Sequence, residues 1–274
     1  MDDHHGILSP NLAMADLKKL DSIAVLCDTA GMTYPGGKSA DGVYQQIINQ
    51  IPPHRVYIEP FLGGGAVLLH KRPAIASIAI DSDGNVVEKF QDLIAKNSDT
   101  VPPGTIVKNG DAISFLRSYE FKGDEFVYAD PPYLMSTRTS KRKLYRVEFG
   151  DEDQHIQLLD VLNSLPCMVA ISGYWSSLYE NKLSGWRSIN YKTTKRSGEV
   201  ATEYLWMNYP EPKELHDYRY LGQNFRQRER IKRIKTRWLA RLARMDPLER
   251  FAMLSSIAEF ADAGHQLASS KTAI

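Results

Sequence analysis

The run Asp130-Pro131-Pro132-Tyr133 directly follows the apolar stretch 126–129. A carboxylate and a backbone carbonyl, held in place by two stiff prolines, can accept both hydrogens of an exocyclic amine on a nucleobase and aim its lone pair at an electrophile. The tyrosine ring offers a surface on which an extruded base can stack. We therefore predict that Asp130, Pro131, Pro132 and Tyr133 form the catalytic loop of an amine-alkylating enzyme that needs no covalent nucleophile.

A glycine-rich turn, Glu59-Pro60-Phe61-Leu62-Gly63-Gly64-Gly65, follows the apolar stretch 56–58. Glycines at such a turn let the backbone approach a ligand closely. Asp81 ends the next apolar stretch, where an acid accepts hydrogen bonds from ribose hydroxyls. The turn lacks the Lys-Ser/Thr ending of a phosphate-binding loop. The pattern thus predicts a nucleoside cofactor without phosphates, and S-adenosylmethionine fits that description.

Short apolar stretches alternate with helical ones along most of the chain. We predict helices over 43–50, 85–96 and 154–165, and strands over 56–58, 77–80, 106–108, 126–129, 168–171, 186–190 and 203–207. The interval between the last two strands is too short for a crossover helix, which favours an antiparallel hairpin. The order predicts an α/β, Rossmann-like methyltransferase fold: a seven-stranded, mostly parallel sheet with a C-terminal hairpin and a helical appendage.

The Asp-Pro-Pro-Tyr loop, with Glu-Pro-Phe-x-Gly-Gly-Gly upstream, resembles the Dam-type (D12 class) family of DNA adenine N6-methyltransferases. The segment Tyr34-Pro35-Gly36-Gly37-Lys38 stands where that family has a Gly-Gly-Lys element, with tyrosine in place of the usual tryptophan. The resemblance runs from about residue 32 to residue 209. It implies methyl transfer from S-adenosylmethionine to the N6 amino group of adenine in DNA.

The resemblance also implies which residues bind the cofactor. Asp81 matches the family's ribose-binding acid, and Asp111 matches the acid that binds the cofactor's adenine. The full expected set is Tyr34, Lys38, Glu59, Pro60, Phe61, Gly63, Gly65, Asp81, Asp111 and Asp130.

One feature departs from the larger members of the family, which carry a target-recognition domain between these two acids. Here the interval between Asp81 and Asp111 has room for one helix and a Pro-Pro-Gly loop only. We therefore predict relaxed or short-site sequence specificity.

Basic residues gather in two places although the net charge of the chain is only +1. The helical stretch 225–245 carries nine basic residues and one acid, a net charge of +8, which leaves −7 for the rest of the chain. Such asymmetry indicates a nucleic-acid contact, with packing on the catalytic domain, a protein partner or a membrane surface as alternatives for the helix. The expected DNA contacts are Arg138, Lys141, Arg142, Lys143, Arg146, Arg230, Arg233 and Arg237.

The remaining patterns set the organisation of the chain. We predict an N-terminal tail and helix over 1–30, a catalytic domain over 31–210 and a basic helical extension over 211–274, which could support a homodimer. No apolar run reaches about 20 residues and no secretion pattern is present, so we expect a cytoplasmic, bacterial or phage-encoded protein without a membrane contact. The histidines lack metal-ligand spacing, and we expect no metal.

Three alternatives share the same residue pattern. Methylation of cytosine N4 uses the same acceptors, although serine is usual there in place of Asp130. Methylation of adenine in RNA is the second alternative, because the catalytic loop does not contact the sugar. A catalytically inactive nucleic-acid-binding protein on the same fold is the third, and the intact loop argues against it.

Overall fold

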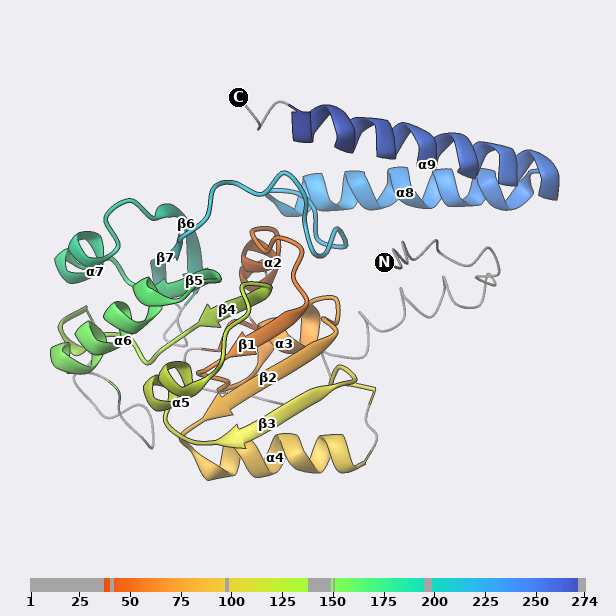
Figure 1. Ribbon diagram of the computed structural model, residues 1–274. Helices are drawn as coiled ribbons and strands as arrows, with labels where there is room; N and C mark the ends of the chain where they lie inside the picture. Colours follow the sequence, from red (N-terminus) through yellow and green to blue (C-terminus); the bar gives the residue numbers. More distant parts are fainter. Residues whose placement is uncertain are drawn as a thin grey trace. The chain divides into compact units, whose positions relative to one another are not determined.

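The computed structural model describes residues 37–39, 42–96, 99–137, 149, 151–194 and 199–270, with side chains up to residue 261. The chain divides into two compact units, one ending at Tyr220 and one beginning at Leu221, and both appear in Figure 1. Within the described ranges, no helix is both long and apolar enough to cross a membrane.

A seven-stranded sheet forms the centre of the first unit, as predicted. The strands are β1 (Val56–Glu59), β2 (Ala76–Asp81), β3 (Thr105–Asn109), β4 (Glu125–Ala129), β5 (Met168–Gly173), β6 (Arg187–Thr194) and β7 (Val200–Met207). Their order is β3-β2-β1-β4-β5-β7-β6. The first five pair in parallel, and β7 pairs antiparallel with both β5 and β6. This arrangement confirms the predicted mostly parallel sheet with a C-terminal hairpin.

The hairpin is longer than predicted. The β6–β7 ladder continues from the pair Arg187–Met207 to the pair Thr194–Val200, so most of the interval that was expected to connect the strands belongs to them. Lys192, Thr193 and Thr194 do not show the apolar pattern of a buried strand. They can be polar because this part of the hairpin has an exposed face.

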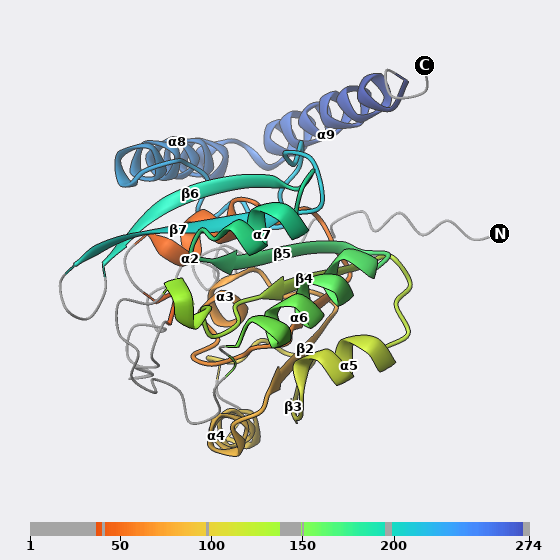
Figure 2. The same cartoon turned by 90° about the vertical axis from the view of Figure 1, so that its left-hand side faces the viewer.

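Helices cover both faces of the sheet. The helices are α2 (Val43–Ile48), α3 (Ala66–His70), α4 (Gly84–Ala95), α5 (Ala112–Ser118), α6 (Glu152–Ser164) and α7 (Ser177–Lys182), with a short 3₁₀ turn η2 (Met135–Thr137). The core that includes Tyr57 and Tyr128 contains residues of α2, α3 and α4. The core that includes Ile58 and Val127 contains residues of α5, α6 and α7, which lie in front of the sheet in Figure 2. Burial on both sides explains why β4 is apolar at nearly every position.

The first unit includes residues 211–220, which the sequence pattern places in the C-terminal extension. Side chains and carbonyls of this segment bind the first unit: the His216 ring stacks on His54 at 3.9 Å, Arg219 donates to the His70 carbonyl at 2.7 Å, and Asn49 donates to the Tyr220 carbonyl at 2.7 Å. The first compact unit therefore ends at Tyr220 rather than at residue 210, because the contacts that attach this segment are long-range and leave no local pattern. The predicted N-terminal tail and helix lie outside the described residues.

The second unit consists of α8 (Phe225–Arg244) and α9 (Pro247–Ser270). Asn224 caps α8 by accepting from the Gln227 N–H at 3.0 Å, and Asp246 accepts from the Leu248 N–H at 2.9 Å. α9 thus begins with a capping carboxylate followed by a proline at the first helical position. No side chain of α8 is buried.

Candidate active site

The candidate site lies where the strand order changes direction. β2 and β3 extend the sheet on one side of β1, and β4 lies on the other, with Ile58 opposite Val127. Ligands of open α/β sheets bind at the carboxyl ends of the strands flanking such a point. A cavity there is lined by every expected catalytic or cofactor-binding residue that the structure describes: Lys38, Glu59, Pro60, Phe61, Gly63, Gly65, Asp81, Asp111, Asp130, Pro131, Pro132 and Tyr133. Tyr34 lies outside the described residues.

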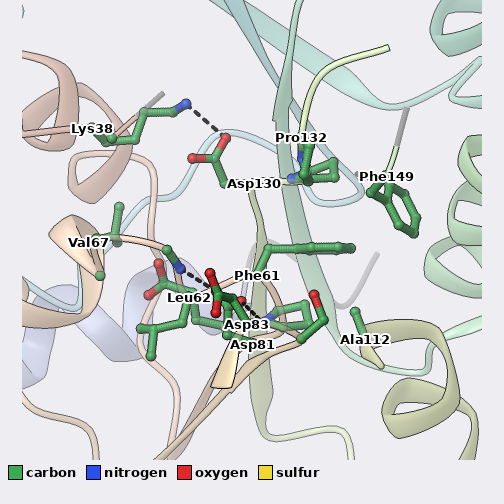
Figure 3. A pocket seen from close by; sticks show the side chains of 18 of the residues that line it. Lys38, Phe61, Leu62, Val67, Asp81, Asp83, Ala112, Asp130, Pro132 and Phe149 are labelled. Carbon is green, nitrogen blue, oxygen red and sulfur yellow. Dashed lines mark hydrogen bonds and ion pairs between the residues drawn. The ribbon is translucent and has the colours of Figure 1, made fainter. Parts of the chain in front are cut away.

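Asp81 fixes the glycine-rich turn to the end of β2. One carboxylate oxygen accepts from the Gly63 N–H and the other from the Asp83 N–H, both at 2.8 Å. Burial raises the pKa of Asp81, and these two backbone donors act in the opposite direction. Figure 3 shows Asp81 and Asp83 together at the opposite end of the cavity from Lys38 and Asp130.

Gly65 is a position in this turn where a side chain would be both strained and obstructed. Its φ is +62°, and a Cβ atom there would lie 2.6 Å from Cζ of Phe90 on α4. Any side chain would therefore meet both backbone strain and a clash with a buried ring. Because Gly65 has no side chain, the backbone of the turn can pack against Phe90 and approach a ligand closely.

Lys38 is the centre of a buried ionic cluster at the other end of the cavity. Its Nζ lies 2.8 Å from Oδ1 of Asp130 and 3.3 Å from Oε2 of Glu203 on β7. It also donates to the Tyr133 hydroxyl at 2.5 Å. Only 4% of the Lys38 side chain is exposed, so its charge is neutralised by the two carboxylates rather than by water.

The cluster controls the charge of Asp130. Burial alone would lower the pKa of Lys38, but Asp130 and Glu203 outweigh it and raise that pKa, so Lys38 stays cationic. Burial raises the pKa of Asp130 to about 6, with Lys38 opposing this and Glu203 adding to it. Asp130 is therefore a carboxylate at neutral pH that is easily protonated below it.

Glu59 forms an uncharged part of the cavity wall near neutral pH. It is buried at the end of β1, and its Oε2 accepts from the Tyr57 hydroxyl at 2.8 Å. Burial raises its pKa to about 8, the hydrogen bond from Tyr57 opposes this, and the nearby Asp130 charge adds to it. Protonated Glu59 can donate a hydrogen bond into the cavity, which a carboxylate could not do.

Aromatic rings and a helix start form another wall. Phe61 and Phe149 meet edge to face with centroids 5.2 Å apart, and both line the cavity. Asp111 caps α5 by accepting from the Ser114 N–H at 2.8 Å. This wall combines apolar rings with one carboxylate, a combination that suits a flat, amine-bearing heterocycle.

None of the expected DNA contacts lies in the described part of the first unit. Arg138, Lys141, Arg142, Lys143 and Arg146 lie outside the described residues. Arg230, Arg233 and Arg237 are exposed on α8 in the second unit. In the described part of the chain, no group of three metal-ligating side chains is present.

Glu203, Phe149 and Tyr174 are among the residues at the site that the sequence did not predict. Glu203 carried a usable signal, because an acid within a strand destined for burial needs a cationic partner. Phe149 and Tyr174 carried none. Tyr174 follows β5 and contacts the Tyr133 ring edge on at 4.5 Å.

Comparison with known protein families identifies one family that the chain matches. A model of the D12 class N6 adenine-specific DNA methyltransferase family matches residues 34–103 and 91–196, together more than half of the chain. No curated protein sequence matches.

Solved structures of methyltransferases are also similar to the chain. A dimethyladenosine transferase from Plasmodium falciparum is 16% identical, over 60% of this chain and 59% of that one, with a TM-score of 0.40. An rRNA methylase from Streptococcus thermophilus is 12% identical, over 60% of this chain and 93% of that one, also with a TM-score of 0.40.

Proposed function

The chain belongs to the D12 class N6 adenine-specific DNA methyltransferase family, and we propose that it transfers a methyl group from S-adenosylmethionine to the N6 amino group of adenine in DNA. One observation carries the proposal. The amine-acceptor loop Asp130–Tyr133 and the glycine-rich turn line the same cavity, as a reaction between a bound base and a bound cofactor requires.

The residues present fit S-adenosylmethionine. The described lining of the cavity carries the carboxylates of Asp81, Asp83, Asp111 and Asp130 and one cation, Lys38, which the cluster already neutralises. Such a site favours a cationic ligand and disfavours a phosphate. Asp81 and the Gly63–Gly65 turn would hold the ribose and the methionine part, and Asp111 with the Phe61 ring would hold the adenine part. When bound, the cofactor supplies an electrophilic methyl group on a sulfonium.

Asp130 and the Pro131 carbonyl prepare the amine. As acceptors for the two N6 hydrogens, they draw the lone pair out of the ring's conjugation and fix its direction. The carboxylate form of Asp130 is required, so activity is expected to rise as the pH passes its pKa of about 6.

Tyr133 presents its ring in one orientation. The hydrogen bond from Lys38 fixes its hydroxyl, and the edge contact with Tyr174 fixes its plane. A ring held at both points can stack on an extruded base without losing rotamer freedom on binding.

The basic helix α8 is proposed as a phosphate contact. Its nine cations with one acid and its lack of buried side chains fit a surface that binds a polyanion through summed charge. Such contacts position a duplex without reading its sequence. Between Asp81 and Asp111 the described residues hold α4, a short loop and β3, and the lack of a recognition domain there supports relaxed or short-site specificity. The homodimer stays a prediction.

The test is transfer of a radioactive methyl group to matched DNA and RNA oligonucleotides, with the product nucleoside identified by mass spectrometry. We expect N6-methyladenine in DNA, and a loss of about 100- to 1000-fold in kcat for Asp130→Ala. Thermal unfolding of Asp130→Ala, compared with that of wild type, is the control that the variant still folds. N4-methylcytosine, a preference for RNA, or undiminished transfer by Asp130→Ala would contradict the proposal.

A further inference from the structure

A second, open groove lies beside the catalytic loop. Its aromatic lining comes from Tyr174 and Trp175 after β5 and from Tyr204 on β7, and its hydroxyl lining includes Ser136, Thr137 and Thr202. Among the lining residues that the structure describes, none is charged. A neutral surface of rings and hydroxyls suits a nucleobase, whose faces stack and whose edges accept and donate hydrogen bonds, and does not suit a phosphate.

The groove adjoins the catalytic cavity through two aromatic rings. Tyr133 lines the cavity, Tyr174 lines the groove, and the two rings meet edge on at 4.5 Å. η2 follows the catalytic loop directly and supplies the groove's other wall. A strand whose target base lies at Tyr133 therefore brings its neighbouring nucleotide to this groove.

Trp175 is the exposed stacking surface of the groove. Its side chain is 52% exposed, although an indole is among the largest apolar groups a protein can bury. A cation stands next to the groove as well, because Lys192 donates to the Thr202 hydroxyl at 2.7 Å. A nucleotide whose base stacks on Trp175 would thus have a cation, Lys192, beside the groove for its phosphate.

We infer that this groove binds the base adjacent to the target adenine, by stacking on Trp175. The inference rests on the proposed function and adds a substrate-positioning residue to it. Hydroxyl groups both donate and accept hydrogen bonds, so the groove can bind any of the bases. It distinguishes a base from an abasic site rather than one base from another. This gives the chain a contact beyond the target base without a recognition domain.

The test combines a protein change with a DNA change. Methyl transfer is measured for wild type and Trp175→Ala on one oligonucleotide and on versions with an abasic site on either side of the adenine. We expect Trp175→Ala to lower kcat/KM by about 5- to 100-fold, mainly through KM, on intact DNA. On DNA that is abasic at one of the two neighbouring positions, the same substitution should have almost no further effect.

Two controls sharpen the result. Trp175→Phe keeps a ring and should recover most of the activity, whereas Ile106→Ala truncates an equally exposed apolar side chain (52%) on β3 at the opposite edge of the sheet and should change nothing. The inference would be overturned if the losses from Trp175→Ala and from the abasic site multiply at both neighbouring positions, or if Trp175→Ala causes no loss of activity.

Failure of the proposed function can be told apart from failure of this inference. If wild type methylates no DNA, fluorescence quenching of an oligonucleotide carrying 2-aminopurine beside the adenine still decides whether the groove stacks a base. Quenching that is lost in Trp175→Ala and kept in Trp175→Phe supports the groove. Quenching equal in all three proteins refutes it.

Discussion

The two units of the chain use charge in opposite ways. In the first unit, Lys38 is buried between Asp130 and Glu203, and Arg219 is paired with buried Asp217. In the second, the nine cations of α8 face one acid and none of them is buried. Buried pairs depend on geometry, so losing one member leaves an uncompensated charge. Exposed charges act through their sum, so each can be replaced.

The largest expected effect is on the first unit. Gly65→Ala should lower the free energy of unfolding by about 2–5 kcal/mol, because a left-handed φ and a clash with Phe90 combine. Urea denaturation measures this. Gly84→Ala is the matched control, since a Cβ there meets nothing within 4 Å; equal losses in the two variants would contradict the explanation.

A second effect follows from the buried Glu59. Its pKa is raised from 4.5 to about 8, so its proton stabilises the folded state fully below pH 4.5, and this stabilisation is lost as the pH rises to about 8. Glu59→Gln stays neutral and loses nothing. Its free energy of unfolding, relative to wild type, should therefore increase between these pH values, by at most about 1.4 kcal/mol per pH unit.

The control for Glu59 is Glu88→Gln, an exposed position on α4 that removes the same formal charge. Thermal or urea unfolding across the pH range gives both curves. A constant difference between Glu59→Gln and wild type would show that Glu59 is ionised in the folded protein.

Substitutions in the second unit should have smaller effects, and these should appear in the salt dependence of DNA binding. Replacing Arg230, Arg233 and Arg237 together with alanine should reduce the slope of log affinity for DNA against log salt by about 3, since each phosphate contact contributes about 0.9. The KM for DNA should change more than kcat. The triple lysine variant keeps the charges, and its slope should stay that of wild type; an unchanged slope in the alanine variant would remove α8 from the DNA contact.

The smallest effect should be a shift in the pH dependence of catalysis. The Glu203 charge raises the pKa of Asp130, so Glu203→Gln should move the acid limb of the kcat profile to lower pH. Thr193→Val removes a hydroxyl 3.2 Å from Glu203 Oε1 but keeps the charge, and it should not move the limb downward. A shift to higher pH in Glu203→Gln would contradict this electrostatic effect of Glu203 on Asp130.

The sequence was sufficient wherever the site is built from one continuous segment. Asp130–Tyr133 and the Glu59–Gly65 turn each follow an apolar strand, and parallel strands bring their carboxyl ends to one edge. The sheet could be predicted for the same reason. Its hairpin was underestimated because polar residues are allowed where one face of a ladder is exposed.

The rest depends on long-range contacts that leave no local pattern. Phe149 reaches the cavity from just before α6, and Glu203 reaches Lys38 from β7, far along the chain. The His54–His216 stack attaches residues 211–220 to the first unit although their composition resembles a linker. Only the whole fold determines which of these side chains meet.

The pairing of β1 with β4 has a consequence for the substrate. The cofactor turn leaves β1 and the amine acceptors leave β4, and backbone hydrogen bonds join these strands up to the pair Ile58–Val127. The spacing between the ends of these two strands is thus fixed when the sheet forms. If a base has to be extruded to reach this preset site, the cost of unstacking falls on the nucleic acid, and an adenine in a mismatch or a single strand should react faster than one in a perfect duplex.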